Sequence, residues 1–589
     1  MKAKNIIYIG GRLFALCVLC ALTACSDFLE IKSREEILLE DFWNEKADVD
    51  NIVAGCYSGM QADNVITRMI VWGEARSENM MVGPHDPMDG DLENVLKENI
   101  KTKNFYTTWD GFYTVINRCN TVLKYAPGVA ERDPGYTQSE LQATIAEVSA
   151  LRDLCYFYLI RTFRDVPFTT QAYIDDNQKM DVEPTPFYDV LDSLITDLEK
   201  VQGYAMKRYP STKTAYQTCR ITKSAIWAML CELYLWKGDY QSCIHYADLV
   251  IEDKKDLVKE RLSQGVGGTF EKSSNESRFN GYPLISYTSA YDKIFSTGSS
   301  QETIFELLFD KSDPGYSRLG NSAVGRLYGS VDFTPYIVPS NTVSEDGFDK
   351  TTQRVIYADR NKFRDARISW NTEFDTKYIC KYAYGSVAYV SSTSSNYTSL
   401  GANKYRYNKE NNVDHFRNSS PWIIYRLTDI MLLKAEALCQ QLHEGSESDV
   451  LEYNAPILDE IFSLVNAVNK RAVAQTTLVD TLLASNYRTK ATAEALVMKE
   501  RQRELMFEGK RWFDLVRYAM RAGNTEVVCD AIRLREGINS QYVLNTFRSS
   551  TTGMYAIFWP YNDEETKVNP NLAKHQNPAF DSGESNISK

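Results

Sequence analysis

The stretch SAIWAMLCELYLWKGDYQSCIHYADLVIE, Ser224–Glu252, carries the pattern that decides the fold. Its apolar spacing predicts one helix, a tight connection at Lys237-Gly238-Asp239, and a second helix that returns beside the first. Small or apolar side chains at the facing positions allow two antiparallel helices to approach closely. These positions are Ala228, Leu235, Cys243 and Ala247.

This helix pair resembles one tetratricopeptide unit, a helix–turn–helix repeat. A second candidate unit is Tyr425–Gln440 followed by Ile457–Ala472. Three more segments have helical periodicity: 109–127, which we expect Pro127 to end, 146–168, with Pro167 just beyond the helix, and Phe187–Val201. No strict 34-residue repeat is visible. The prediction is a mostly α protein with a degenerate tetratricopeptide-like array.

The middle of the chain, residues 254–420, has a different character. Gly, Ser, Asn and Tyr become frequent, and long periodic helices vanish. Ser386–Asn412 is close to low complexity and predicts a loop or hairpin, whereas Gln301–Asp310 predicts a strand or short helix. We therefore expect an N-terminal helical region at 25–253, a variable loop-rich region at 254–420 and a C-terminal region at 421–589, with loops that carry function.

The first 24 residues have the pattern of a lipoprotein signal peptide. A basic start precedes the apolar run Leu13–Leu22, which is too short to span a bilayer. The following Leu22-Thr23-Ala24-Cys25 resembles a lipobox, so cleavage is expected before Cys25, which would then carry lipid. The alternative is an ordinary signal peptide that happens to end near a cysteine.

Charge and cysteine content restrict the possible partners. The net charge of −12 disfavours nucleic acid and anionic lipid headgroups, so attachment to a membrane would come from the acyl chains. The cysteines after Cys25 form no CxxC pair and no zinc spacing. We expect them to be buried free thiols, although an exported chain could form a disulfide.

The sequence contains no recognisable catalytic motif: GxSxG, HExxH, P-loop and GxGxxG patterns are all absent. Only five histidines are present, in scattered contexts. The acidic stretch Asp86–Asn94 lacks the spacing of a calcium loop, so a solvated loop is favoured there. No cofactor is expected, and a structural calcium ion stays open.

The most charged segment is RQRELMFEGKRWFDLVRYAM, Arg501–Met520. On one continuous helix, Glu500, Glu504 and Glu508 would share a face, flanked by Arg501 and Arg511. Paired carboxylates can perform acid–base catalysis when one pKa is raised, but surrounding arginines favour the charged form. We therefore interpret the segment as a belt of ion pairs between helices.

This segment, extended to KERQRELMFEGKRWFDLVRY, also closely resembles the C-terminal signature of the SusD/RagB-like family of Bacteroidetes outer-membrane lipoproteins. Further matches follow in the right order along nearly the whole chain. They are the opening after Cys25 with Phe42-Trp43, the Asn117 and Asn120 helix, the helix ending in Asp165-Val166-Pro167, the late helix pair, and the tail of Asn-Pro turns.

The resemblance implies a non-enzymatic lipoprotein of the cell surface and outer membrane. Such proteins capture oligosaccharides, or in some members peptides, and deliver them to a SusC-type TonB-dependent barrel that they cover as a lid. A surface glycoside hydrolase and a tetratricopeptide scaffold that binds only peptides or proteins remain the alternatives.

Sugar rings stack on aromatic faces and need a few fixed polar partners. Composition and chain order suggest that tyrosines of the variable loops, with two residues of an early loop, contact the ligand. The candidates are Tyr282, Tyr287, Tyr291, Tyr316, Tyr328 and Tyr336, with Arg76 and His85.

Overall fold

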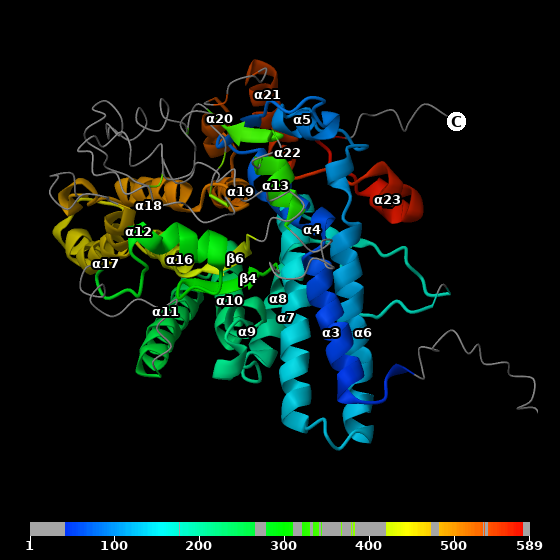
Figure 1. The fold of residues 1–589 in the computed structure, drawn as a ribbon. Helices are drawn as coiled ribbons and strands as arrows, with labels where there is room; N and C mark the ends of the chain where they lie inside the picture. The colour runs from blue at the N-terminus through cyan, green and yellow to red at the C-terminus, as the bar shows by residue number, and fades with distance from the viewer. Residues whose placement is uncertain are drawn as a thin grey trace, which may run out of the picture.

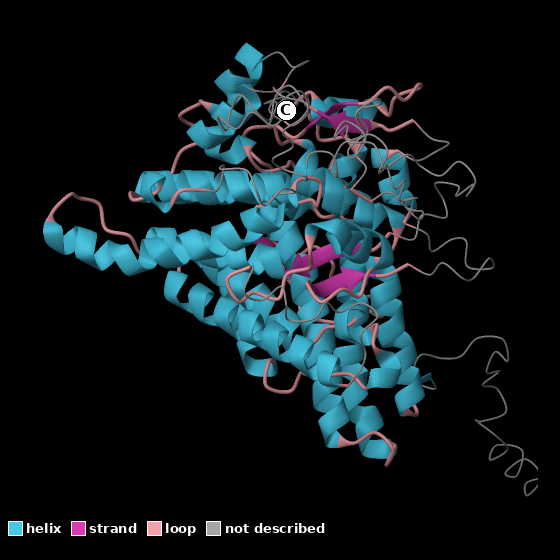
Figure 2. Ribbon diagram, turned by 60° about the vertical axis from the view of Figure 1, so that its left-hand side comes forward, coloured by secondary structure: helices cyan, strands magenta, loops and turns pink. Residues whose placement is uncertain are grey.

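The computed structural model describes residues 42–175, 177–264, 279–309, 321–329, 334–340, 420–472, 482–533 and 540–580, with the single residues 343, 367, 379, 381, 382 and 535. The described chain is mostly helical, and its strands form short two-stranded pieces (Figures 1 and 2). This architecture confirms the predicted fold class. None of the helices in these ranges is both long and apolar enough to cross a bilayer.

Three long helices stand side by side in the N-terminal part: α3 (Lys46–Met60), α6 (Asp110–Arg132) and α7 (Gln138–Phe163) (Figure 1). Thr137 and Glu140 form a capping box that begins α7. The expectation that Pro127 ends α6 was wrong, because the helix continues to Arg132. A proline removes one helical hydrogen bond, but packing of α6 against α3 and α7 supports the helix on both sides of it.

The helix pair predicted from Ser224–Glu252 is present as α10 (Lys223–Lys237) and α11 (Tyr240–Ser263). Gly238 ends α10 in the left-handed conformation, with φ at 83°, which glycine adopts without strain. The close approach is real, since the sulfur atoms of Cys231 and Cys243 lie 3.7 Å apart. The helix α8 (Phe187–Val201) packs beside α7 and α10 and has the predicted ends.

The second predicted unit is α16 (Leu427–Gln440) and α17 (Ser448–Ala472), with α18 (Lys490–Leu505) packed against both. Helix α16 also packs on α11, so the two units form one continuous array. Tyr425 belongs to a strand and not to the helix, because β6 (Trp422–Arg426) leads directly into α16.

Each of the three described strand pairs is antiparallel, and two of them, β1 with β5 and β4 with β6, join distant parts of the chain. Strand β1 (Met80–Val82) pairs with β5 (Ile337–Pro339), β2 (Val166–Pro167) with β3 (Pro184–Thr185), and β4 (Thr303–Leu307) with β6. The segment Gln301–Asp310 therefore contains a strand, one of its two predicted forms. Through β4, the middle region is attached to the entrance of α16.

The C-terminal part returns to the N-terminal helices through α19 (Arg511–Ala522), α20 (Glu526–Arg533), α21 (Ser540–Phe547), α22 (Gly553–Ala556), α23 (Asp563–Val568) and α24 (Pro570–Lys574). The backbone N–H of Trp559 donates to the carbonyl of Thr162 at 2.8 Å, and Asp563 N–H donates to Thr102 at 3.0 Å. The remaining helices are α4 (Asp63–Ile70), α5 (Gly90–Leu96), α9 (Tyr216–Cys219), α12 (Tyr287–Tyr291) and α13 (Ser322–Tyr328).

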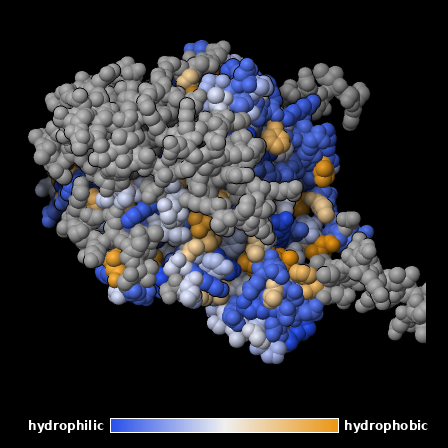
Figure 3. Space-filling view, viewed as in Figure 1, coloured by the Kyte–Doolittle hydropathy of each residue, from blue (hydrophilic) through white to orange (hydrophobic). Residues whose placement is uncertain are grey.

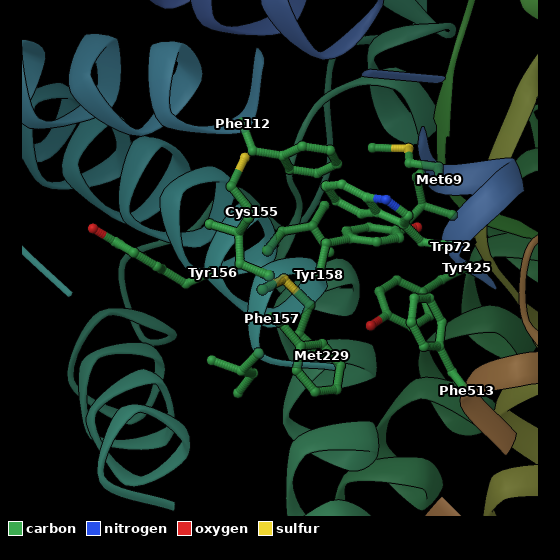
Figure 4. Packing of buried hydrophobic residues seen from close by; sticks show 14 of the residues in the cluster. Met69, Trp72, Phe112, Cys155, Tyr156, Phe157, Tyr158, Met229, Tyr425 and Phe513 are labelled. Atoms are coloured by element: carbon green, nitrogen blue, oxygen red, sulfur yellow. The ribbon is translucent and has the colours of Figure 1, made fainter. Parts of the chain in front are cut away.

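The two ends of the chain share one hydrophobic core (Figure 4). Trp72 stacks on Phe112 with ring centroids 5.0 Å apart, and Tyr158 meets Phe513 edge to face at 6.1 Å. The cysteines among the described residues are all free, and most are buried, which confirms the thiol prediction for these positions.

Candidate functional site

Glu504 is the centre of a buried ion-pair belt. Its carboxylate accepts hydrogen bonds from Arg426 at 2.5 Å and Arg367 at 3.3 Å, and from Arg471 as well. Only 3% of Glu504 is exposed, and burial alone would raise its pKa. The charges of the three arginines outweigh burial and hold that pKa well below its usual value.

Glu508 does not continue the helix of Glu504, so the predicted single helical face was wrong. Helix α18 ends at Leu505, and α19 begins at Arg511. Phe507 and Gly509 between them have φ values of 69° and 70°. In this turn the Glu508 carboxylate receives a two-pronged contact from Arg426, at 2.7 and 2.8 Å, and a third from Lys381 at 2.6 Å.

The other charges of the segment also pair with partners from distant elements. Arg501 contacts Asp514 at 2.9 Å and Asp429 at 3.0 Å, while Arg511 contacts Glu78 at 2.5 Å. Arg517 of α19 contacts Glu436 of α16 at 2.7 Å. The predicted ion-pair belt between helices is confirmed, and pairs one helical turn apart, Arg517 with Asp514 at 2.7 Å and Arg503 with Glu500 at 3.2 Å, add to these tertiary contacts. Buried, paired carboxylates of lowered pKa are unsuited to general acid catalysis.

Two of the predicted ligand contacts are buried inside the protein. Arg76 is 1% exposed, pairs with Glu98 at 2.8 Å and lies 4.3 Å from the ring centroid of Trp512. The hydroxyl of Tyr328 donates to the carbonyl of Phe507 at 3.0 Å. Both side chains therefore fix the core in this structure, and the prediction that they face a ligand is corrected. This burial could not be predicted from local sequence patterns, because Trp512 and Phe507 lie far from Arg76 and Tyr328 in the chain.

His85 and Tyr336 meet at the surface. Pairing of β1 with β5 places the two segments together, and the ring centroids lie 4.3 Å apart. The Nδ1 atom of His85 lies 2.8 Å from the carbonyl oxygen of Thr334. Both side chains are half-buried, so each keeps exposed surface. Of the predicted contacts, this is the pair that the described structure brings together.

The remaining candidates are spread apart. Tyr282 is half-buried, and the ammonium of Lys255 lies 5.6 Å from its ring centroid. Tyr291 is half-buried against Phe295, with ring centroids 5.3 Å apart. The side chain of Tyr287, and the residues Tyr316 and Cys25, lie outside the described residues. Ligand contact by these residues stays a prediction.

A cavity of about 390 Å³ lies on another part of the molecule. The first turns of α6, the segment 167–182 and the tail helices α23 and α24 form its walls. Hydrophobic residues reach the surface near this tail, on the right side of Figure 3. The lining residues are Trp109, Asp110, Tyr113, Thr114, Ile116, Asn117, Asn120, Pro167, Thr169, Tyr173, Met180, Val182, Glu565, Val568, Asn569 and Leu572.

Amide side chains hold the cavity walls in place. Asn117 donates to the carbonyl of Tyr173 at 2.8 Å and accepts from its N–H at 2.7 Å. Asn569 donates to the carbonyl of Val182 at 2.7 Å. The hydroxyl of Tyr113 donates to the carbonyl of Pro167 at 2.7 Å. Sequence reasoning missed this cavity, although Asn117, Asn120 and the Asn-Pro tail were noted as family features.

The acidic stretch 86–94 behaves as a capped loop and helix. Asp89 caps α5 by accepting from the N–H groups of Asp91 and Leu92, and it also accepts from the Tyr106 hydroxyl at 2.7 Å. Across the described residues, no group of three or more His, Cys, Asp or Glu side chains could hold a metal ion.

The fold is a helical array against which the C-terminal tail packs, with short strand pairs between segments of the chain. This architecture is typical of a class of scaffold proteins. Comparison of sequences then gives the family. The sequence model of the SusD family matches residues 268–580, and a second model, described as starch-binding and associating with the outer membrane, matches residues 27–235. The chain belongs to the SusD family.

Known relatives match along nearly the whole chain. SusD-like protein P38 of Formosa agariphila is 24% identical over 527 residues, which are 88% of this chain and 92% of the relative. A SusD homolog from Bacteroides thetaiotaomicron has the same fold, with a TM-score of 0.63, 17% identity and coverage of 92% of this chain and 98% of that one. A laminarin-binding SusD-like protein aligns with a TM-score of 0.58 and 17% identity over 91% of this chain and 99% of that one.

Proposed function

We propose that the protein is a lipid-anchored lipoprotein of the outer-membrane surface that binds glycans and delivers them to a SusC-type TonB-dependent barrel. The observation that carries the proposal is the match of SusD family models to both halves of the chain. The laminarin-binding relative of the same fold supports a carbohydrate ligand. The protein would bind without cleaving bonds and without a cofactor. A structural calcium ion remains an untested expectation.

The His85–Tyr336 pair is our first choice for a glycan contact. An aromatic face can stack on the C–H surface of a sugar ring, and a nearby imidazole can exchange hydrogen bonds with hydroxyl groups. The carboxylates of the ion-pair belt offer no such surface, because they are buried and paired. Membrane attachment would come from lipid on Cys25, as the lipobox predicts.

The test is a binding screen with the mature chain from Ser26 onward. Polysaccharides and host glycans are titrated by calorimetry, and new reducing ends are counted in the same samples. We expect binding without new reducing ends, weakened about fivefold by Tyr336→Ala, since loss of a stacked ring costs of order 1 kcal/mol. New reducing ends would indicate a glycoside hydrolase. Binding of peptides but no glycan would indicate a peptide or protein scaffold.

Delivery to a barrel needs a separate experiment. The full lipidated chain, expressed in its own host, should co-purify with a TonB-dependent barrel after detergent extraction. Replacement of Cys25 by Ala should release the protein from the membrane fraction. Retention of Cys25→Ala in the outer membrane without its barrel would contradict the proposed anchor.

A further inference from the structure

The cavity between α6 and the tail has the dimensions of a small-ligand site. Its volume of about 390 Å³ lies within the range of pockets that enclose small molecules. It shares no residue with the His85–Tyr336 pair. Three separate parts of the chain form it, so its shape depends on the closed fold.

The walls of the cavity are aromatic and apolar. Tyr113 and Tyr173 are half-buried, and their backbone and side-chain hydrogen bonds hold them in place. Met180 and Val568 at the rim are 52% and 75% exposed. Such surfaces suit the C–H face of a ring, and aromatic faces also attract a positive charge.

The cavity is charged with one sign only. Its lining includes two carboxylates, Asp110 and Glu565, and no Lys, Arg or His. Burial raises the pKa of Glu565, hydrogen bonds from Trp109 oppose that increase, and the charge of Asp110 adds to it. A bound cation would relieve this unfavourable charge, whereas a neutral sugar would not.

The other polar groups of the wall are already used by the protein. The amide of Asn117 is bonded to Tyr173, and the Thr114 hydroxyl donates to the carbonyl of Asp110 at 2.9 Å. Asp110 is exposed and receives a long contact from Asn64 at 3.4 Å, and its charge raises the pKa of Arg68, a buried residue outside the cavity lining, against the effect of burial. A carboxylate has about four acceptor positions, so Asp110, and Glu565 beyond its hydrogen bonds from Trp109, keep capacity to accept hydrogen bonds from a ligand.

We propose that this cavity binds an amino sugar, with the protonated amine held by Asp110 and Glu565 and the ring against Tyr113 and Tyr173. The carboxylates would accept charge-assisted hydrogen bonds from the ammonium, and the tyrosines would supply stacking. The inference rests on the proposed function in that the ligand is a carbohydrate, but it names a different site and a different ligand class.

The test compares matched ligands by calorimetry at pH 7 and low salt, using the same chain from Ser26 onward, which carries no lipid. The probes are a β-1,4-linked glucosamine tetramer and its fully N-acetylated counterpart. We expect the free-amine tetramer to bind at least about tenfold more tightly, because only it carries the positive charge. Equal affinity for the two tetramers, or no binding of either, would overturn the proposal.

Variants locate the site. Glu565→Gln and Asp110→Asn should each weaken binding of the glucosamine tetramer about tenfold. The matched control is Glu564→Gln, since Glu564 is adjacent, exposed and paired with Lys567 at 2.6 Å outside the cavity. Loss of glucosamine binding in His85→Ala together with its retention in Asp110→Asn and Glu565→Gln would assign the amine to the other site and overturn the proposal.

A lysine side chain carries the same amine chemistry, so Nα-acetyl-lysine amide is titrated as a third probe. We expect it to bind at least about tenfold more weakly than the glucosamine tetramer, because it has no ring to stack. Equal or tighter binding of the lysine probe would assign the cavity to a peptide and overturn the amino-sugar proposal. Failure of the wider glycan screen together with success here would contradict only the proposed His85–Tyr336 site.

Discussion

Carboxylate side chains cluster in two regions of this protein, and the regions differ in the number of Arg and Lys side chains that contact these carboxylates. In the ion-pair belt, Glu504 contacts three arginines and Glu508 contacts Arg426 and Lys381. In the cavity beside α6, Glu565 and Asp110 share a wall with no base. The carboxylates of the belt are neutralised by basic side chains of the protein. The proposed role of the cavity carboxylates is to bind a positively charged ligand.

The difference teaches that an acidic cluster is best interpreted from its partners. Burying a charge is costly unless it is paired and hydrogen-bonded, so a fully paired belt behaves as architecture. A half-exposed carboxylate without a base retains the capacity to bind something else. The belt is the more conspicuous region in the sequence, but the cavity is the better candidate for binding.

The largest effect is expected from breaking the belt at its centre. Glu504→Gln keeps the shape of the side chain but leaves Arg426, Arg471 and Arg367 without their shared counter-charge. We expect a loss of about 3–5 kcal/mol in the free energy of unfolding, measured by urea denaturation at pH 7.

The control for that variant is Asp530→Asn, which removes an exposed partner of Arg533 at 2.6 Å. It should change the free energy of unfolding by less than about 0.5 kcal/mol. A loss below about 1 kcal/mol in Glu504→Gln would show that the belt is not a structural centre.

The turn that positions Glu508 should be nearly as sensitive. Gly509 has a φ of 70°, and an added Cβ would lie 2.7 Å from the carbonyl oxygen of Met69. Gly509→Ala should therefore cost about 2 kcal/mol or more in unfolding free energy. Gly523→Ala is the matched control, because its φ is 66° and the space around it is open, so its cost should be about 1 kcal/mol. Equal losses would exclude the steric contact as the cause.

Glu306 is an intermediate case: it is buried like the belt, but among the described residues its carboxylate accepts a hydrogen bond from the N–H of Ser299, at 2.7 Å, and makes no ion pair. Burial raises its pKa to about 7, against hydrogen bonds from Thr218 and Ser299 and the charge of Lys254. A raised folded-state pKa means that ionised Glu306 destabilises the fold. This cost is full above pH 7 and disappears as the pH falls toward 4.5, the ordinary value.

Glu306→Gln should accordingly raise the free energy of unfolding by about 3 kcal/mol at pH 8 and by much less at pH 5, measured by denaturation at both pH values. Glu436→Gln provides the contrast, since Arg517 at 2.7 Å and Arg521 hold the pKa of Glu436 below its usual value, so this variant should lose stability at pH 8. A gain from Glu306→Gln that is equal at both pH values would contradict the charge explanation.

The smallest effect on stability is expected in the cavity, at Glu565. Glu565 has no base to lose, so Glu565→Gln should leave the free energy of unfolding within about 0.5 kcal/mol of the parent. Its effect should appear instead in the affinity for the glucosamine tetramer. A large loss of stability would show that Glu565, like Glu504, stabilises the fold.

Local periodicity was enough to predict much of the helical array. Helix α8 begins and ends where Phe187–Val201 predicted, and Gly238 separates α10 from α11 as expected. It failed where tertiary packing decides the outcome. Pro127 continues a helix that its neighbours support, and the continuous pattern around Glu504 and Glu508 conceals a turn.

The candidate sites were less predictable because they depend on contacts between distant segments. The meeting of His85 with Tyr336 follows from the pairing of β1 with β5, which neither segment shows by itself. Arg76 resembled a surface residue in the sequence, but it pairs with Glu98 and lies against Trp512. The cavity needs α6 and the tail together, so no single stretch contains its pattern.

The close backbone contact between Gly73 and Gly509 has a consequence for how the chain folds. A Cβ on Gly73 would lie 1.9 Å from the carbonyl oxygen of Gly509, so two segments over 400 residues apart touch through bare backbone. In many repeat proteins each repeat contacts only its neighbours, so folding can begin anywhere and spread along the chain. Here the first helices gain their final neighbours only after the last part of the chain has been synthesised. Truncation near residue 500 should therefore expose the N-terminal core to proteases, and the missing segment supplied as a separate chain should restore its protection.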